Sequence, residues 1–388
     1  MVAARRTVTK LGSSILAASI AVALPSITCA ASASTALSWN PQAAAKYLDQ
    51  RAAWWMSWPG SARDQGTSCI SCHTALPYAL SRPALENLLD EKGSSEQEAK
   101  LLDGVIKRVR LWSEAKPYYG DQAGANKASQ SRGTESVLNA LILSSADARR
   151  GKLSDDTRAA FRSMWALQEA SGESKGAWPW LDFGNEPFEA KDSVFYGACL
   201  AAIAVGTAPE SIRASGDLVD NVKALRDYLD REYTSQSLAN QVVLLWASTK
   251  LPQLLTAKEQ GAIIDAILGK QLDDGGWGLS SLVWSWKGTS VRSLVKLWAK
   301  SESPIFPAKS DGYATGLIVF ALEQYGVTAD NAHLQRGLAW LQHNQLPDGR
   351  WPGYSLNHAL EASSPTKLFM GDAATAYAVL ALTEIGQH

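Results

Sequence analysis

The sequence predicts an all-α fold built from repeated helical hairpins, and two recurring patterns support this prediction. The first is an apolar helix of small and branched residues that starts at an acid or an amide. Its expected starts are Glu135, Asp192, Asn240, Asp311 and Asp372. These helices lack a polar stripe, so each must be surrounded by other helices. Their irregular spacing of roughly 50–70 residues leaves room for one hairpin per repeat.

The second pattern is a turn in which Gln is followed by Gly and Trp. It is clearest as QLDDGGWG at 271–278, recurs as QLPDGRW at 345–351, and is looser at 168–178. Glycine lets the backbone pass close to the indole, while Gln and Trp tie one helix end to the next turn. The repeated turn also gives a structural reason for the high content of fifteen Trp.

This turn carries a family resemblance. Gln271, Gly275 and Trp277 stand in a Gln-x-x-x-Gly-x-Trp arrangement that resembles the QW repeat of squalene-hopene cyclases and their relatives. The run Asp372–Ala378 is similar to the inner helices of the same superfamily, which includes protein prenyltransferase β subunits. The resemblance implies an α/α toroid of about five or six helical hairpins, terpenoid cyclase-like in form. It implies less about activity, because one fold hosts many functions.

The cyclase chemistry itself is not matched by the residues. Class II terpene cyclases use an Asp-x-Asp-Asp-Thr-Ala acid, whereas 371–376 reads GDAATA, with Ala where the decisive carboxylates stand in the family. Cys199 lacks the flanking pattern of the prenyltransferase zinc site and is expected in the core. A cyclase-like enzyme therefore stays only as an alternative.

A different toroid enzyme, a glycan hydrolase or lyase, would need two carboxylates as acid and base. Four acids at the expected starts of inner helices would ring the mouth of the toroid: Glu135, Asp192, Asp311 and Asp372. The competing interpretation makes them helix N-caps, which their positions suit well. Whether the protein is an enzyme stays open at this point.

Residues 1–33 are expected to form a signal peptide. Arg5, Arg6 and Lys10 give a charged start, a small apolar run follows, and Ala31–Ala33 fits an A-x-A cleavage site. We expect cleavage near Ala33 and a periplasmic or secreted protein. A Trp-rich segment at 34–65 then precedes the toroid, which we expect to occupy 66–388. No other apolar run is long enough for a transmembrane segment.

Cys69-Ile70-Ser71-Cys72-His73 is a Cys-x-x-Cys-His motif, the pattern of covalent haem attachment in c-type cytochromes. The two thiols add to the haem vinyl groups, and the adjacent His becomes an axial ligand of the iron. The export signal agrees, since c-type haem is attached outside the cytoplasm. The resemblance to cytochromes is confined to these residues. We therefore expect one haem c, held by Cys69, Cys72 and His73, for electron transfer or ligand sensing.

Two other interpretations of the motif stay open. One is a Cys69–Cys72 disulfide in a non-catalytic, cyclase-like binding protein, and the other is a metal site that needs a fourth ligand. For a haem, Met370 is the first candidate for the second axial ligand, and His358 the next. The motif lies one repeat spacing before Glu135, so Cys69–Leu80 is expected to be the inner helix that completes a ring of six hairpins.

The composition limits the partners. The chain is 46% hydrophobic and 19% charged, its formal net charge is −1, and it has no basic patch, so a nucleic-acid partner is not expected. The expected partners are a redox protein or a small apolar ligand in the toroid.

Overall fold

The structure, a computed structural model, describes residues 39–209, 218–283, 302, 308–357, 361 and 364–384. The predicted signal peptide at 1–33 and the candidate ligand His358 lie outside these residues.

The regular secondary structure of the described residues is almost entirely helical. One short antiparallel pair, β1 (Ala62–Arg63) with β2 (Thr67–Ser68), precedes the Cys-x-x-Cys-His motif. The α-helices are α1 (Pro41–Ser57), α2 (Ala75–Leu88), α3 (Glu96–Arg110), α4 (Lys127–Arg150), α5 (Asp155–Ala166), α6 (Ser193–Thr207), α8 (Val219–Glu232), α9 (Leu238–Lys250), α10 (Ala257–Leu268), α11 (Leu279–Val283), α13 (Gly312–Tyr325), α14 (Ala332–His343) and α15 (Phe369–Glu384). Short 3₁₀ turns are η1 (Asp64–Gly66), η2 (Asp121–Ala123), η4 (Tyr233–Ser235) and η5 (Pro365–Leu368).

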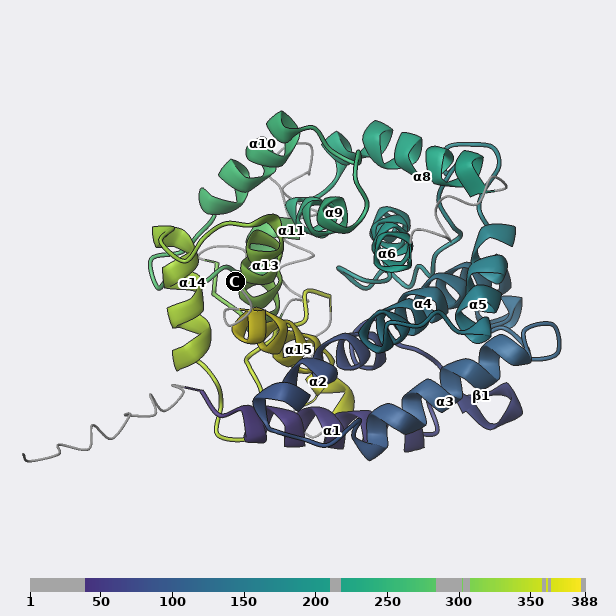
Figure 1. Cartoon of the computed structure of the whole chain (residues 1–388), viewed down its shortest axis with the longest axis horizontal. Coiled ribbons are helices and arrows are strands. Elements are labelled where there is room, and N and C mark those ends of the chain that lie inside the picture. The colour runs from purple at the N-terminus through teal and green to yellow at the C-terminus, as the bar shows by residue number, and fades with distance from the viewer. Residues whose placement is uncertain are drawn as a thin grey trace, which may run out of the picture. The chain divides into compact units, whose positions relative to one another are not determined.

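Within the described residues, six inner helices form a closed ring. In ring order they are α2, α4, α6, α9, α13 and α15, and α15 packs back against α2. Outer helices α1, α3, α5, α8, α10 and α14 surround them (Figure 1). The predicted all-α toroid of five or six hairpins is therefore confirmed, and the motif's helix α2 does complete a ring of six.

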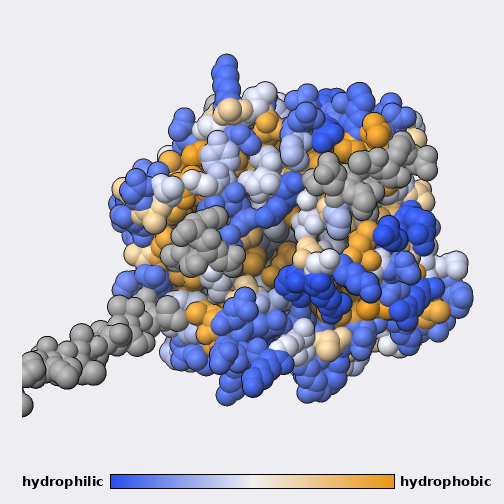
Figure 2. Space-filling view, in the orientation of Figure 1, coloured by the Kyte–Doolittle hydropathy of each residue, from blue (hydrophilic) through white to orange (hydrophobic). Residues whose placement is uncertain are grey.

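The two layers follow from the sequence pattern. Inner helices α6, α13 and α15 are buried on nearly all sides, as expected for helices without a polar stripe. A Cβ added at Gly316 of α13 would lie 2.6 Å from the backbone of α15, so glycine permits this close helix contact. Outer helix α3 buries one stripe that includes Leu101, Val105 and Val109. The end of the toroid shown in Figure 2 is mostly hydrophilic, with hydrophobic side chains between the polar ones.

The Gln–Gly–Trp turns form the predicted ties between helices. The Gln271 side-chain amide donates to the carbonyl of Gly275 inside its own turn and to that of His333, at 2.8 Å each. The Trp277 indole donates to the Ile267 carbonyl at 2.8 Å. One side chain therefore fixes its turn and attaches it to the next hairpin.

The same pattern recurs in the other two turns. Gln168 donates to Gly176 at 2.9 Å and to Asn221 at 3.0 Å. Gln345 donates to Gly349 and to Asn40, at 2.9 Å each. Since Asn40 caps the first helix, the last of these turns closes the ring.

Several helix starts differ from the prediction. Helix α4 begins at Lys127, so Glu135 lies in its interior, and Asn240 lies inside α9, which Ser237 caps. Asp372 is the fourth residue of α15 and not its cap. The prediction placed each start at an acid or an amide. It therefore missed the polar first turns of α4 and the short stretches from Leu238 and Phe369 that begin α9 and α15.

Candidate functional site

The Cys-x-x-Cys-His motif lies in a turn between β2 and inner helix α2. The expected helix from Cys69 is wrong at its start, because α2 begins at Ala75. The Ser71 hydroxyl accepts hydrogen bonds from the backbone of Thr74 at 3.2 Å and of Ala75 at 3.0 Å. The Trp55 indole donates to the Cys69 carbonyl at 2.8 Å. These bonds fix the motif at the N-terminal end of an inner helix.

A cavity of about 560 Å³ lies beside this turn. Most of its wall comes from α1 and from the loops that precede inner helices α2, α6 and α15, so the loops do gather at one end of the toroid. The wall is largely aromatic and apolar, with Trp55, Trp58, Ile70, Tyr119, Leu181, Phe183, Phe188 and Phe369 among its residues. A cavity of this size takes a cofactor or a small ligand.

Three of the predicted haem-site residues line this cavity: Cys69, His73 and Met370. The His73 ring stacks on Phe369 with 3.8 Å between ring centroids and meets Trp55 edge-on at 5.2 Å. Burial, with a smaller effect from Arg51, lowers the pKa of His73 to about 3. The imidazole is therefore neutral, the form that ligates metals.

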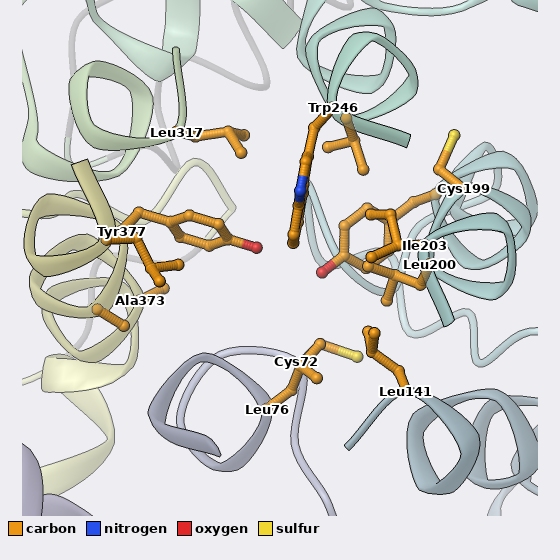
Figure 3. Close-up of a cluster of buried hydrophobic side chains, with 14 of the residues drawn as sticks. Cys72, Leu76, Leu141, Cys199, Leu200, Ile203, Trp246, Leu317, Ala373 and Tyr377 are labelled. Carbon is orange, nitrogen blue, oxygen red and sulfur yellow. The ribbon is translucent and has the colours of Figure 1, made fainter. Parts of the chain in front are cut away.

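Cys72, by contrast, faces the centre of the ring. It is buried in the hydrophobic core, and Figure 3 shows its sulfur pointing toward Leu141, between Leu76 and the helix that carries Ile203. Burial raises the pKa of the Cys69 thiol to about 12 and that of Cys72 well above its usual range. Cys69, Cys72 and Cys199 are unpaired thiols, and Cys199 lies in the core as expected.

The residues fit a c-type haem with one exception. The cavity offers a thiol, a neutral imidazole and a thioether on a mostly apolar wall. The exception is Cys72, whose side chain has to turn from the core toward the cavity before a second thioether bond can form.

The cavity also contains carboxylates. Glu186 and Glu189, on the loop before α6, both line it. Burial, with the nearby charges of Asp192 and Asp182, raises the pKa of Glu186 to about 7. Burial also raises the pKa of Glu189. Glu186 can therefore carry a proton near neutral pH, as a general acid does.

Of the four acids predicted at the mouth of the toroid, two have a structural role: Glu135 is part of an ion pair, and Asp311 caps a helix. Glu135 accepts from Arg108 Nε at 2.6 Å and Nη2 at 2.8 Å, fully buried. Asp311 is the predicted N-cap: it accepts from the backbone of Ala314 at 2.8 Å and of Leu279 at 2.7 Å. Burial raises the pKa of Asp311 to about 6.

The other two acids differ from each other. Asp372 is buried between α15, α1 and the motif, and it accepts from Arg51, Tyr47 and Thr74. Asp192 is half-buried at the N-cap position of α6, where its side chain makes no capping bond. It lies 3.4 Å from the Asn240 amide. The cavity wall includes none of the four acids.

Across the described ranges, no cluster of three or more His, Cys, Asp and Glu side chains could hold a metal ion. The metal-ion interpretation of the motif therefore has no support in these ranges. No helix there combines the length and apolarity required to cross a membrane.

Sequence reasoning missed two residues of this site. Phe369 stacks on His73, and Thr74 binds its Nδ1. Thr74 adjoins the motif and could have been found from the sequence. Trp55 and Phe369 come together only when the ring closes.

The fold and the site define the class of protein as an all-α toroid with a cavity at one end. The chain matches no protein-family model and no curated protein. Among solved structures it is similar to one described as a wild-type glycosidase, with a TM-score of 0.51 and 13% identity over 89% of this chain and 97% of the other. A glycosidase variant in complex with glucose gives a TM-score of 0.51 and 12% identity over the same shares. At these identities the likeness shows the fold alone.

Proposed function

We propose that this protein is an exported c-type haem protein whose haem lies in the cavity beside the motif. The observation that carries the proposal is that Cys69, His73 and Met370, all named from the sequence, line one largely apolar cavity. Cys69 and Cys72 would hold the haem covalently, and His73 and Met370 would be its axial ligands. The scaffold resembles the squalene-cyclase toroid in its three Gln–Gly–Trp turns.

The bound haem would supply one-electron transfer or the binding of a small ligand at iron. The residues of the chain would tune this chemistry. Phe369 and Trp55 hold the His73 ring in place from two sides. The aromatic wall keeps water away from the ligands, and a dry surrounding affects the reduction potential.

The first experiment is a haem stain and an intact mass of the protein exported by a host with cytochrome c maturation machinery. The proposal expects a red protein heavier by one haem, and loss of this mass in Cys69→Ala/Cys72→Ala. Cys199→Ala is the matched control, since Cys199 lies in the core, and it should keep the haem. A colourless wild-type protein would contradict the proposal.

A second candidate function is a glycan hydrolase or lyase. The observation in its favour is that Glu186 and Glu189 line the same cavity as Trp55 and Trp58, whose rings can stack on sugars. Similar folds occur in proteins described as glycosidases. Activity on a glycan panel that survives Cys69→Ala/Cys72→Ala and disappears in Glu186→Gln and Glu189→Gln would favour this function over the first.

A further inference from the structure

We propose that Asp372 and Thr74 are positioning residues that hold His73 in a single tautomer, with the proton on Nδ1 and the lone pair of Nε2 presented to the cavity. The purpose of this arrangement rests on the proposed function, because a haem iron needs that lone pair. The tautomer itself is a property of the protein without haem.

The arrangement starts at the carboxylate of Asp372. Arg51 donates to it from Nε at 2.7 Å and from Nη2 at 2.9 Å, and Tyr47 donates from its hydroxyl at 2.7 Å. Both charged groups are buried, since Arg51 is 7% exposed and Asp372 is 2% exposed. Arg stays protonated in proteins, so its buried charge requires an ionised partner. Asp372 is therefore a carboxylate and only accepts hydrogen bonds.

Thr74 connects this carboxylate to the motif. Its hydroxyl oxygen lies 2.7 Å from Asp372 Oδ2 and 2.9 Å from His73 Nδ1. A hydroxyl carries one hydrogen, and Thr74 donates it to Asp372 because a carboxylate can only accept. Toward His73 the Thr74 oxygen is then an acceptor, so Nδ1 must be the donor.

The other ring nitrogen is left for the cavity. In the part of the chain that the structure describes, Nε2 has no hydrogen-bond partner, and the half-buried His73 side chain lines the cavity. Nε2 is therefore the ring nitrogen that a ligand in the cavity can meet. Partners that fix the tautomer of a metal-binding imidazole also raise its basicity as a ligand.

The three residues come from distant parts of the chain: Arg51 from α1, Thr74 from the turn before α2, and Asp372 from α15. The first and last hairpins must close the ring before the hydrogen bonds can form. Closure of the ring and orientation of His73 are thus the same structural event.

The test uses the full-length mature chain as Cys69→Ala/Cys72→Ala, labelled with ¹⁵N-histidine and made without haem. Its His73 signals, assigned by their loss in His73→Gln, should show a protonated Nδ1 and an unprotonated Nε2. Valine keeps the shape of the Thr74 side chain but cannot accept a hydrogen bond from His73 Nδ1. Thr74→Val should therefore give a mixture of the two tautomers, or the tautomer with the proton on Nε2. Thr74→Ser should restore the original tautomer, whereas a purely structural role would leave the tautomer unchanged in all variants. Circular dichroism checks that each variant is folded.

A titration of the same variants with ferric protoporphyrin IX separates this inference from the proposed function. We expect binding about 10–100-fold weaker in Thr74→Val than in Thr74→Ser. Protonation at Nε2 in the parent protein, or a Thr74→Val variant with an unchanged tautomer, overturns the inference. If the tautomer is as expected but the exported wild-type protein carries no haem, the haem proposal fails and the positioning of His73 stands.

Discussion

Replacement of Arg108 by Met tests whether Glu135 is a structural or a functional acid. Arg108 and Glu135 are 1% and 0% exposed, and they form two hydrogen bonds of 2.6 and 2.8 Å. Among the described residues, the variant leaves Arg132, at 3.5 Å, as the remaining ion-pair partner of Glu135. Removal of one partner of a buried ion pair costs about 3–5 kcal/mol, because the other charge stays buried. At about 2 °C per kcal/mol for a protein of this size, the melting temperature should fall by about 6–10 °C.

The pH dependence of this variant has a defined sign. Burial already raises the pKa of Glu135, and Arg108 opposes that rise. Without Arg108 the folded state retains the Glu135 proton to higher pH than the unfolded chain does. Stability is therefore lost as the pH rises from about 4 through the folded pKa, so the defect is smallest in acid.

The assay is urea unfolding of both proteins between pH 5 and pH 8, with the double variant Arg108→Met/Glu135→Leu as control. Apolar replacement of both partners should recover most of the lost stability. A loss below about 1 kcal/mol in Arg108→Met, or a double variant as unstable as the single one, would refute the structural role of the pair.

Three further predictions concern ring closure, a buried acid and the proposed axial ligand. Gly349→Ala should cost about 2–4 kcal/mol in urea unfolding, because φ is +92° there and the new Cβ would meet the Ala43 carbonyl; Gly326→Ala, at φ +93° in open space, should cost less. Burial, with Glu384 nearby, raises the pKa of Glu323 to about 8, so wild-type stability should fall as the pH rises from about 4.5 to 8. Glu323→Gln should remove this part of the pH dependence of stability, and an unchanged slope of stability against pH would contradict the prediction. In the haem-loaded protein, Met370→Ala should change the visible absorption spectrum, while Met164→Ala in the core should not; identical spectra would exclude Met370 as a ligand.

The fold could be predicted because its signals are local. Gln271, Gly275 and Trp277 lie within seven residues of sequence that make their own turn, and the same pattern makes the same bonds at Gln168 and Gln345. The apolar inner helices α6, α13 and α15 are equally visible, since they are buried on nearly all sides. The first turns of α4 were missed because polar residues such as Lys127 begin this helix before the apolar run does.

The site was predicted only where its residues carry a motif or precede a recognisable helix. His73 and Met370 were found in this way, and both line the cavity. The role of Asp372 was not found, because its partner Arg51 is 321 residues away in sequence. Cys72 was expected to face the same way as Cys69, and its burial in the core follows from packing of the inner ring.

Glu186 distinguishes the two proposed functions, because it lies in the cavity with His73 and Met370. Its pKa of about 7 is raised by burial and by Asp192 and Asp182, so it gains a negative charge near neutral pH. A negative charge near the haem favours ferric iron. Under the haem proposal, Glu186→Gln should therefore keep the haem and raise the reduction potential more at pH 8 than at pH 6.

Under the hydrolase proposal the same change should abolish turnover, because the amide cannot donate the proton that a general acid supplies. The two experiments are potentiometry of the red protein and a glycan assay of the purified chain, each at both pH values. A haem-loaded Glu186→Gln protein with an unchanged potential would place Glu186 away from the iron. In that case the cavity would serve a ligand bound apart from the metal, and the carboxylates would be the groups that recognise it.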